Sequence, residues 1–317
     1  MAEQGQGILA AGSLRAWAAA MAAALLTAGT AAAQDARAAP AVFPRPMPVP
    51  TLNFYGAPGA IDMPSGEMQP DGMFSVGLSY FGGNGRYTLT FQGLPWLSAS
   101  FRYNSIENAN IGGYSTYFDR GFDLRFRLLT ETRRRPAVVL GLQDFVGTGI
   151  YAGEYIAATK TLAVPGLGSA ARPGTLRLTG GLGWGRLGSY GSIGSPIGNR
   201  PAYNPNSTGG QVAYDQWFRG PVAPFAALEW RPTDRLGVKV EYSSDRYVTE
   251  TVTSNVFERR SPFNFGVEYQ ATPGIRVGGY VLYGSQVGVN LAFTADPRRP
   301  PQKMVIPAPQ PVAQRPP

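Results

Sequence analysis

The chain has 317 residues, a net charge of +8 and 15% charged residues, and it contains neither cysteine nor histidine. We therefore expect no disulfide, no thiolate metal site, no lipidated cysteine and no serine–histidine catalysis. The positive charge is not gathered in a stripe of the kind that binds nucleic acid, so we expect no nucleic-acid partner. The 41 glycines, 16 tyrosines and 16 phenylalanines indicate many short strands joined by tight turns.

Residues 1–33 have the pattern of a signal peptide. Arg15 supplies the positive charge, residues 16–28 form an apolar, alanine-rich core, and three alanines at 31–33 fit a cleavage site before Gln34. The core is shorter than the roughly 20 residues that a membrane-spanning helix needs. No other stretch is long and apolar enough for such a helix, so we expect an exported chain that enters the outer membrane through strands.

Proline-rich segments flank the middle of the chain. Residues 40–50 read PAVFPRPMPVP, and the following residues up to 72 are rich in glycine and proline. Such composition does not form a core of its own, so we interpret residues 34–72 as a periplasmic lead-in. Residues 295–317 are again proline-rich and are predicted to be a disordered tail.

Between residues 73 and 294, about twelve segments alternate apolar and polar side chains, as strands with one apolar face do. The stretch FDLRFRLL at 122–129, for example, places phenylalanine and leucine on one face and aspartate and arginine on the other. The segments near 137–144, 153–162 and 175–184 show a weaker alternation.

The connections between these segments differ in length from one end to the other. Short connections lie at 95–96, 133–136, 231–234 and 272–274, and long ones at 104–120, 145–152, 186–220 and 244–262. Transmembrane barrels have short periplasmic turns and longer outer loops, and hydrocarbon requires a sheet without free edges. We therefore predict an all-β fold, a transmembrane antiparallel β-barrel of about 12 strands. A soluble sandwich explains any one strand, but it does not explain the one-sided long loops together with a signal peptide.

Charged residues on the polar faces are predicted to line the lumen. They are Arg102, Asp123, Arg125, Arg127, Glu154, Lys160, Lys239, Glu241, Glu268 and Arg276. These charges either hold an acidic glycan or pair with one another and plug the barrel. Asp123 and Glu154 can also be considered as a carboxylate pair for glycoside hydrolysis, but a lumen network of opposed charges is the simpler interpretation. We predict no catalytic residue, no metal site and no cofactor.

One glycine pattern needs a separate interpretation. Gly183, Gly185 and Gly188 match the spacing of a dinucleotide fingerprint, but the sequence after them is rich in Gly, Pro and Asn and predicts no helix. We interpret these glycines as the exit of a strand into a loop.

Several strings go beyond what any barrel requires. They are NFYGAPGAIDMPSGEMQPDG (53–72), FRYN (101–104), YFDRGFDLRFRLL (117–129), PAVVLGLQDFVGTGIYAGEYIAATK (136–160), GGLGWGRLG (180–188) and SPFNFGVEYQ (261–270). Together they resemble the YjbH family of exopolysaccharide-associated outer-membrane β-barrel proteins, over roughly residues 51–294. The resemblance implies an outer-membrane location and a link to capsule or exopolysaccharide biosynthesis, and it implies no catalytic residues. Larger relatives continue into a second module, and some are lipidated, whereas this chain has no cysteine to modify.

The resulting prediction is a non-catalytic outer-membrane barrel that takes part in exopolysaccharide or capsule biosynthesis or export. Its expected partner is outer-membrane lipid, and its candidate partners are an acidic extracellular polysaccharide and other export-machinery proteins. A general diffusion porin or structural barrel remains as the alternative, followed by an outer-membrane hydrolase. Which polymer is handled, and whether the lumen is open, are left undecided by the sequence.

Overall fold

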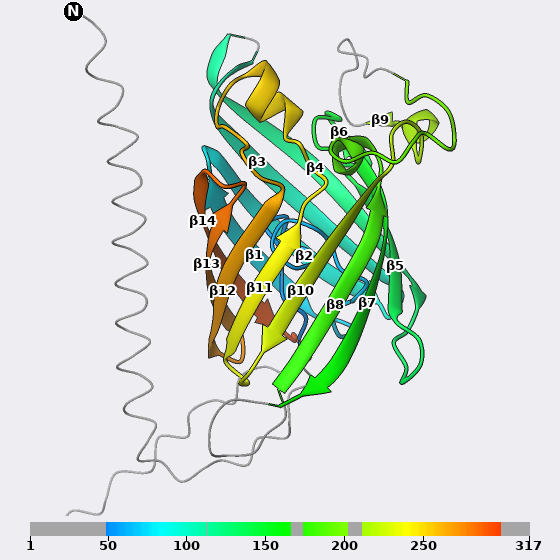
Figure 1. The fold of residues 1–317 in the computed structure, drawn as a ribbon, viewed down its shortest axis with the longest axis vertical. Helices are drawn as coiled ribbons and strands as arrows, with labels where there is room; N and C mark the ends of the chain where they lie inside the picture. The colour runs from blue at the N-terminus through cyan, green and yellow to red at the C-terminus, as the bar shows by residue number, and fades with distance from the viewer. Residues whose placement is uncertain (1–48, 112, 166–173, 202–210, 299–317) are drawn as a thin grey trace, which may run out of the picture. The chain divides into compact units, whose positions relative to one another are not determined.

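The computed structural model describes residues 49–111, 113–165, 174–201 and 211–298 (Figure 1). All of them belong to one compact unit, Val49–Pro317. The predicted signal peptide, the lead-in up to residue 48 and the proline-rich tail beyond residue 298 lie outside the described residues. Among the residues described, no helix is long and apolar enough to cross a membrane.

Twelve antiparallel strands close into a barrel, in which β1 pairs with β14 and completes the ring. The register of that closing pair runs from Phe74 opposite Ala295 to Phe81 opposite Gly288. This confirms the predicted fold class and strand number. The barrel strands are β1 (Phe74–Phe81), β2 (Asn84–Leu94), β3 (Leu97–Ile111), β4 (Tyr114–Leu129), β5 (Ala137–Gln143), β7 (Gly153–Val164), β8 (Gly174–Gly183), β10 (Ala223–Arg231), β11 (Leu236–Tyr242), β12 (Phe263–Thr272), β13 (Ile275–Leu282) and β14 (Gln286–Ala295).

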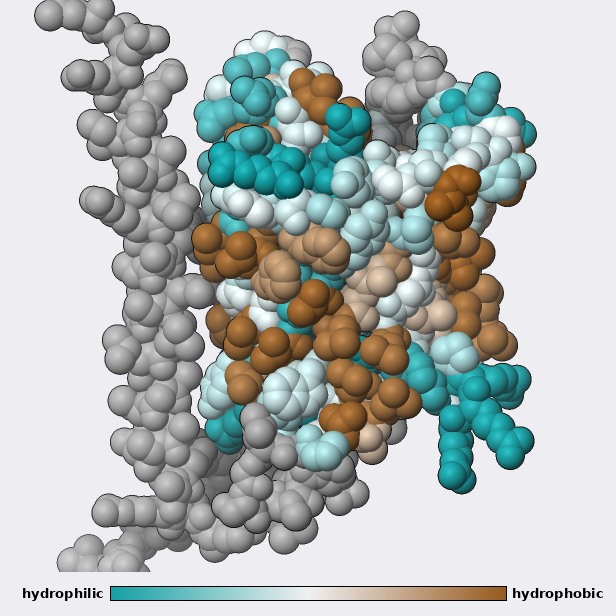
Figure 2. All heavy atoms as spheres, viewed as in Figure 1, coloured by the Kyte–Doolittle hydropathy of each residue, from teal (hydrophilic) through white to brown (hydrophobic). Residues whose placement is uncertain are grey.

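The alternation in the sequence corresponds to an apolar outer face and a polar inner face. On β2, Leu89 and Phe91 are 45% and 48% exposed on the outside. Thr90, which lies between them, and Arg86, which has the same inward register as Thr90, are buried. Figure 2 shows hydrophobic residues gathered over the strands and hydrophilic residues over the loops at one end. Each backbone group of a closed sheet has a partner, so an apolar outer face of this kind suits hydrocarbon.

The two ends of the barrel differ, as predicted. One end carries the short turns after β2, β4, β10 and β12, together with the start of β1 and the end of β14; we call it the lower mouth. The long connections at the other end hold β6 (Val146–Gly147), which pairs with β9 (Gln211–Val212), and three short helical turns. These turns are η1 (Gly185–Gly188), η2 (Tyr214–Gln216) and η3 (Thr249–Thr253).

The predicted long loop at 104–120 is wrong. Strands β3 and β4 continue through this region as a paired hairpin, with Ile111 opposite Tyr114 at its tip. Polar residues occur on both faces of the upper part of this hairpin, so the apolar–polar alternation that marks the lower part fades, although the backbone pairing continues.

The predicted position of residues 51–72 is also wrong. Residues 49–72, which we call the inner segment, do not lie outside the barrel as a periplasmic lead-in, and every residue from 50 to 66 is buried. Their partners lie on strands around the whole ring, from Ser79 on β1 and Thr159 on β7 to Asn290 on β14. A segment that contacts inward-facing groups on opposite sides of a closed barrel lies in its lumen, and Figure 1 shows its trace enclosed by the strands.

The fit of the inner segment against the wall is close. Gly56 has a φ of +70°, and a Cβ atom added there would lie 2.4 Å from the Cβ atom of Thr88 on β2. A side chain at this position would therefore be excluded both by the backbone conformation and by the wall. The glycine and proline content of the segment serves this close approach.

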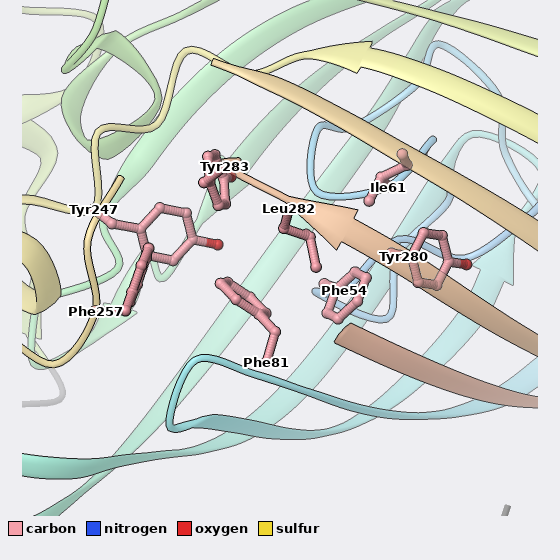
Figure 3. Close-up of a cluster of buried hydrophobic side chains, with 8 residues drawn as sticks. All are labelled: Phe54, Ile61, Phe81, Tyr247, Phe257, Tyr280, Leu282 and Tyr283. Carbon is pink, nitrogen blue, oxygen red and sulfur yellow. The ribbon is translucent and has the colours of Figure 1, made fainter. Parts of the chain in front are cut away.

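Aromatic residues pack where the inner segment meets the upper end of the barrel (Figure 3). The cluster joins Phe54 and Ile61 of the inner segment to side chains of the wall and upper loops, namely Phe81, Tyr247, Phe257, Tyr280, Leu282 and Tyr283. Phe54 makes edge contacts with Phe81 and Tyr280, with ring centroids 5.3 and 5.0 Å apart. Aromatic pairs of this geometry add about 0.5–1.5 kcal/mol beyond burial of their area. Aromatic side chains therefore take up much of the upper part of the lumen.

Candidate functional site

The inner segment enters and leaves through the lower mouth. At its first described residues, the guanidinium of Arg276, next to the lower end of β13, donates to the carbonyl oxygens of Val49 and Pro50 at 3.2 and 3.1 Å. At its other end, the N–H of Gly72 donates to the carbonyl oxygen of Gln92, near the lower end of β2, at 2.8 Å. The segment therefore forms a loop within the lumen rather than a thread through it.

Cations of the wall bind the backbone of this loop. The Arg125 guanidinium on β4 donates to the carbonyl oxygens of Pro58, Ser65 and Glu67 at 2.8–3.0 Å. The ammonium of Lys239 on β11 donates to the carbonyl oxygen of Ala60 at 2.6 Å. The segment pairs part of its own backbone, for example the N–H of Phe54 with the carbonyl oxygen of Ile61, and these buried cations provide donors to further carbonyl groups.

One carboxylate of the wall serves the N–H groups. Glu241 on β11 accepts from the backbone N–H groups of Ile61, Asp62 and Met63 at 2.8–3.0 Å, and from the amide of Asn264 at 2.9 Å. Three successive N–H groups that point at one carboxylate require a tight turn of the backbone at this place. The wall therefore determines the conformation of the loop at its turn.

The side chain of Asp62 is the most deeply enclosed acid of the inner segment. It lies 3.3 Å from the guanidinium of Arg86 and accepts hydrogen bonds from the hydroxyl groups of Tyr247 and Tyr283. Arg86 in turn stacks on Tyr55, with its guanidinium carbon 4.0 Å from the ring centroid. A buried ion pair of this kind costs several kcal/mol in desolvation, and the two tyrosines and the aromatic face offset part of that cost.

A second ion network lies closer to the lower mouth. Glu229 on β10 contacts Arg177 at 3.2 Å, Arg231 and Lys239, and Glu268 on β12 contacts Lys239 at 2.6 Å. Glu67 joins this network through Arg177, at 3.3 Å. Wall and segment thus share one set of paired charges.

Seven of the ten residues predicted to line the lumen point inward and are buried. They are Arg102, Asp123, Arg125, Lys239, Glu241, Glu268 and Arg276. Arg102 pairs with Asp123 at 3.1 Å. Arg127 keeps the inward register, opposite the fully buried Val139, but it lies at the mouth and is partly exposed.

Two of the predicted lumen residues are placed elsewhere. Lys160 is opposite the exposed Leu178, in the outward register of β7, and it bends over the rim to Glu131 and Thr132. Glu154 also has the outward register, opposite Leu142, and is covered by the upper connection, where it pairs with Arg200 at 2.7 Å and accepts the N–H of Phe218. The weak alternation of β7 left its register undecided, and a shift by one residue reverses both faces.

Other lumen residues were missed by the sequence analysis. Arg86 on β2, Arg177 on β8 and Glu229 on β10 are buried and face the lumen, and none of them was among the predicted lumen residues. Asp62 lies in the supposed lead-in. A signal for Asp62 and Glu67 was available, because they are two of the three acidic residues of the 53–72 string that carries the resemblance, but nothing in the string itself says what they contact.

The upper connections close over the inner segment. Arg186 in η1 binds Asp245 at 2.6 Å and Glu250 at 2.8 Å, and its guanidinium lies over the rings of Tyr151 and Tyr247. One side chain thus joins three upper connections. Burial, together with Asp62 and Glu250, raises the pKa of Asp245 to about 6, although Arg186 opposes this rise.

Two small gaps lie between the wall and the inner segment. A cavity of about 10 Å³ is lined by Asn53, Tyr55, Asp123, Arg125 and Tyr155, and a second of similar volume lies beside Glu67, Arg177 and Glu229. Each has room for about one water molecule. In this conformation the inner segment occupies the space that an open channel would need.

These observations agree with the sequence comparisons. The profile of the YjbH family, described as "Exopolysaccharide biosynthesis protein YbjH", matches residues 51–317, a range that contains both the inner segment from Thr51 and the whole barrel. The chain belongs to the YjbH family. It is an exopolysaccharide-related protein built as a closed barrel whose apolar outer face suits a membrane or envelope location.

A curated relative in the YjbH family is the "Uncharacterized lipoprotein YjbH" of Escherichia coli (strain K12), which is 30% identical over 240 residues. The match covers 72% of this chain but 32% of the relative, so this chain spans about a third of that protein's length. Among solved structures, the NanC porin and the KdgM porin in complex with disordered oligogalacturonate match with TM-scores of 0.34 and 0.36. They are 10% and 7% identical, and each match covers 70% of this chain and 98% of the porin.

Proposed function

We propose that this YjbH-family protein is a non-catalytic outer-membrane barrel that serves the export of an exopolysaccharide and that is closed at rest by its inner segment. The family description supplies the link to exopolysaccharide, and the apolar outer face of the strands supports residence in a lipid bilayer. Export as the specific step is our proposal.

The observation that carries this proposal is the attachment of the inner segment. It fills the lumen, polar contacts as well as apolar packing hold it, and it enters and leaves by the lower mouth. A loop attached in this way can be withdrawn through that mouth without crossing the barrel. Water or the hydroxyl groups of a polysaccharide can take over the hydrogen bonds that the wall makes to the backbone of this segment, because such bonds do not depend on the shape of a side chain.

The alternative functions fit the geometry less well. A general diffusion porin needs an open lumen, whereas the described residues fill this one. A hydrolase of the kind considered above needs two carboxylates that face one another across a substrate. Asp123 faces the lumen and pairs with Arg102, while Glu154 has the opposite register and pairs with Arg200, so these two acids do not form such a pair.

Two measurements test the proposed function. Deletion of the gene in its native host should lower or alter extracellular polysaccharide, and the full chain supplied in trans should restore it. The purified chain in a planar bilayer should show little steady conductance, because the lumen is filled. Unchanged polysaccharide in the deletion strain contradicts the proposal, and a large permanent conductance contradicts closure by the inner segment.

A further inference from the structure

The strands of the wall present more cations than acids to the lumen. Among described strand residues that face the lumen with largely buried side chains, seven are cations, namely Arg86, Arg102, Arg125, Arg177, Arg231, Lys239 and Arg276, and five are acids, namely Asp119, Asp123, Glu229, Glu241 and Glu268. The wall therefore has an excess of two positive charges. The inner segment brings two buried or half-buried acids, Asp62 and Glu67, which pair with Arg86 and Arg177.

The polar contacts between the wall and the inner segment are made chiefly to oxygen atoms of the segment. Carbonyl oxygens of the segment accept from hydroxyl, amide, ammonium and guanidinium groups of the wall: Leu52 from Asn290, Phe54 from Ser79, Gly56 from Thr90, Ala60 from Lys239, and Pro58, Ser65 and Glu67 from Arg125. The wall thus presents donors and cations to a chain that is rich in acceptor oxygens and carries carboxylates.

We propose that this wall is a binding track for an acidic polysaccharide and that the inner segment occupies it as an internal ligand. This inference rests on the proposed function and adds the chemical class of the polymer. A chain that contains uronic acid residues carries hydroxyl and ring oxygens along its whole length and a carboxylate on each acidic sugar. It can therefore replace both the carbonyl oxygens and the two carboxylates of the inner segment, whereas a neutral glycan leaves the excess positive charge unpaired.

Arg125 is central to the track. It lies on β4, is 1% exposed and makes four hydrogen bonds, three to the inner segment and one to the hydroxyl of Tyr155. Its planar guanidinium suits a carboxylate or two neighbouring hydroxyl groups, and the adjacent Tyr155 offers an aromatic face for a sugar ring. In the closed state three carbonyl groups take these positions.

The first test loosens the inner segment without altering the wall. In the full chain, Asp62→Asn and Glu67→Gln together remove the two carboxylates that pair with the wall. The matched control is Asp71→Asn, which removes an exposed carboxylate of the same segment. Correct folding of each variant is established by heat-modifiable gel mobility. We expect the double variant to bind oligoglucuronate about tenfold more tightly than the natural chain and the control, and to bind maltodextrin of equal length no better.

Adding Arg125→Gln to the double variant should weaken oligoglucuronate binding about tenfold, since a hydrogen bond to a charged group is worth about 1.5–3 kcal/mol. Adding Lys239→Arg, which keeps the charge, should leave most of the affinity. Equal affinity of the double variant for the acidic and the neutral oligosaccharide overturns the inference, as does binding that is unaffected by Arg125→Gln.

The second test uses an otherwise natural chain. Ala60 is buried in the inner segment, and the chain contains no cysteine, so Ala60→Cys gives a single reporter of displacement. In vesicles, oligoglucuronate should increase labelling of this cysteine by a maleimide severalfold, and maltodextrin should not. No increase at any oligoglucuronate concentration up to the solubility limit overturns the inference.

The outcomes separate the two proposals. If the deletion strain loses polysaccharide but the barrel shows no preference for the acidic oligosaccharide, the proposed function stands and the acidic class is wrong. If the barrel binds oligoglucuronate as described but the deletion strain makes normal polysaccharide, the track stands and the export function is wrong.

Discussion

Glu241, on the barrel wall, accepts the backbone N–H of Asp62 at 3.0 Å to each of its carboxylate oxygens, across 179 residues of sequence. The adjacent N–H groups of Ile61 and Met63 donate to the same carboxylate. This relationship shows how the closed state is built, because a charged side chain of a strand holds the backbone of a segment that has no regular structure. The predictions below follow from such contacts.

Glu241→Gln should loosen the turn of the inner segment. An amide has a single acceptor oxygen and no charge, so some of the three N–H groups lose a partner, at a cost of about 1–3 kcal/mol. Limited proteolysis should cut residues 58–66 faster than in the natural chain, while the barrel remains heat-modifiable. Glu131→Gln, at the rim, is the control, and its residues 58–66 should be cut at the rate of the natural chain. If the protease cuts this segment equally slowly in both variants, Glu241 does not have this role.

Arg125→Ala should open the lumen rather than unfold the barrel. From the alternation alone we expect a mild effect, because a lumen position contacts water. The structure instead leaves three carbonyl groups of the inner segment without their donor. Single-channel recordings should show transient openings that the natural chain lacks. A variant as silent as the natural chain indicates that Arg125 does not hold the segment.

Leu124→Arg should hinder assembly of the barrel, whereas Arg125→Ala should not. Leu124 has the outward register, opposite Leu142, and a charge near the bilayer midplane of a barrel costs about 2–4 kcal/mol. Folding into vesicles, followed by urea titration, should show this loss. Leu124→Ile serves as the control, and equal stability of the arginine and isoleucine variants would falsify the assignment of the outer face.

The connection at 144–152 should loosen as the pH rises. Burial, reinforced by Asp119 and Asp123 and opposed by Arg102, raises the pKa of Asp144 to about 8, and Asp144 accepts the N–H groups of Gly149 and Tyr151. The folded state therefore holds a proton that the unfolded state releases near pH 4. This contribution to stability is complete below pH 4, decreases as the pH rises, and is lost above pH 8.

Hydrogen exchange measures this effect. The protection factors of the Gly149 and Tyr151 amides should fall between pH 6 and pH 9, after correction for the intrinsic exchange rate. In Asp144→Asn, which cannot ionise, they should stay constant over that range. Parallel behaviour of the two proteins would assign the pH dependence to another group.

Single cysteines should report the sidedness of the barrel. Asn110→Cys and Thr251→Cys lie at the end with the long connections, and Arg134→Cys and Asp234→Cys lie in the short turns. An impermeant maleimide added to intact cells should label the first pair and leave the second unlabelled until the outer membrane is broken. Asn206, predicted to lie in the same group as Asn110, is outside the described residues. Labelling of the short turns in intact cells would show that the barrel has the opposite orientation.

The sequence by itself determined the wall of this protein. Alternation such as that of Phe122, Leu124 and Phe126 with Asp123 and Arg125 is a local property, because neighbouring side chains of a strand point to opposite faces whatever they contact. The fold class, the strand number and most of the inward charges therefore followed from the pattern. Where the alternation was weak, as on β7, Glu154 and Lys160 were assigned to the wrong face.

The tertiary structure alone decided what the lumen contains. The inner segment has no periodicity, and its glycines and prolines are equally typical of a linker. Its conformation depends on donors and acceptors that are distant in the sequence, such as Arg125 for Glu67 and Glu241 for Asp62. Only the closed barrel brings these groups together. The charge pattern of the sequence was compatible with an open or a plugged lumen, and the structure shows a filled one.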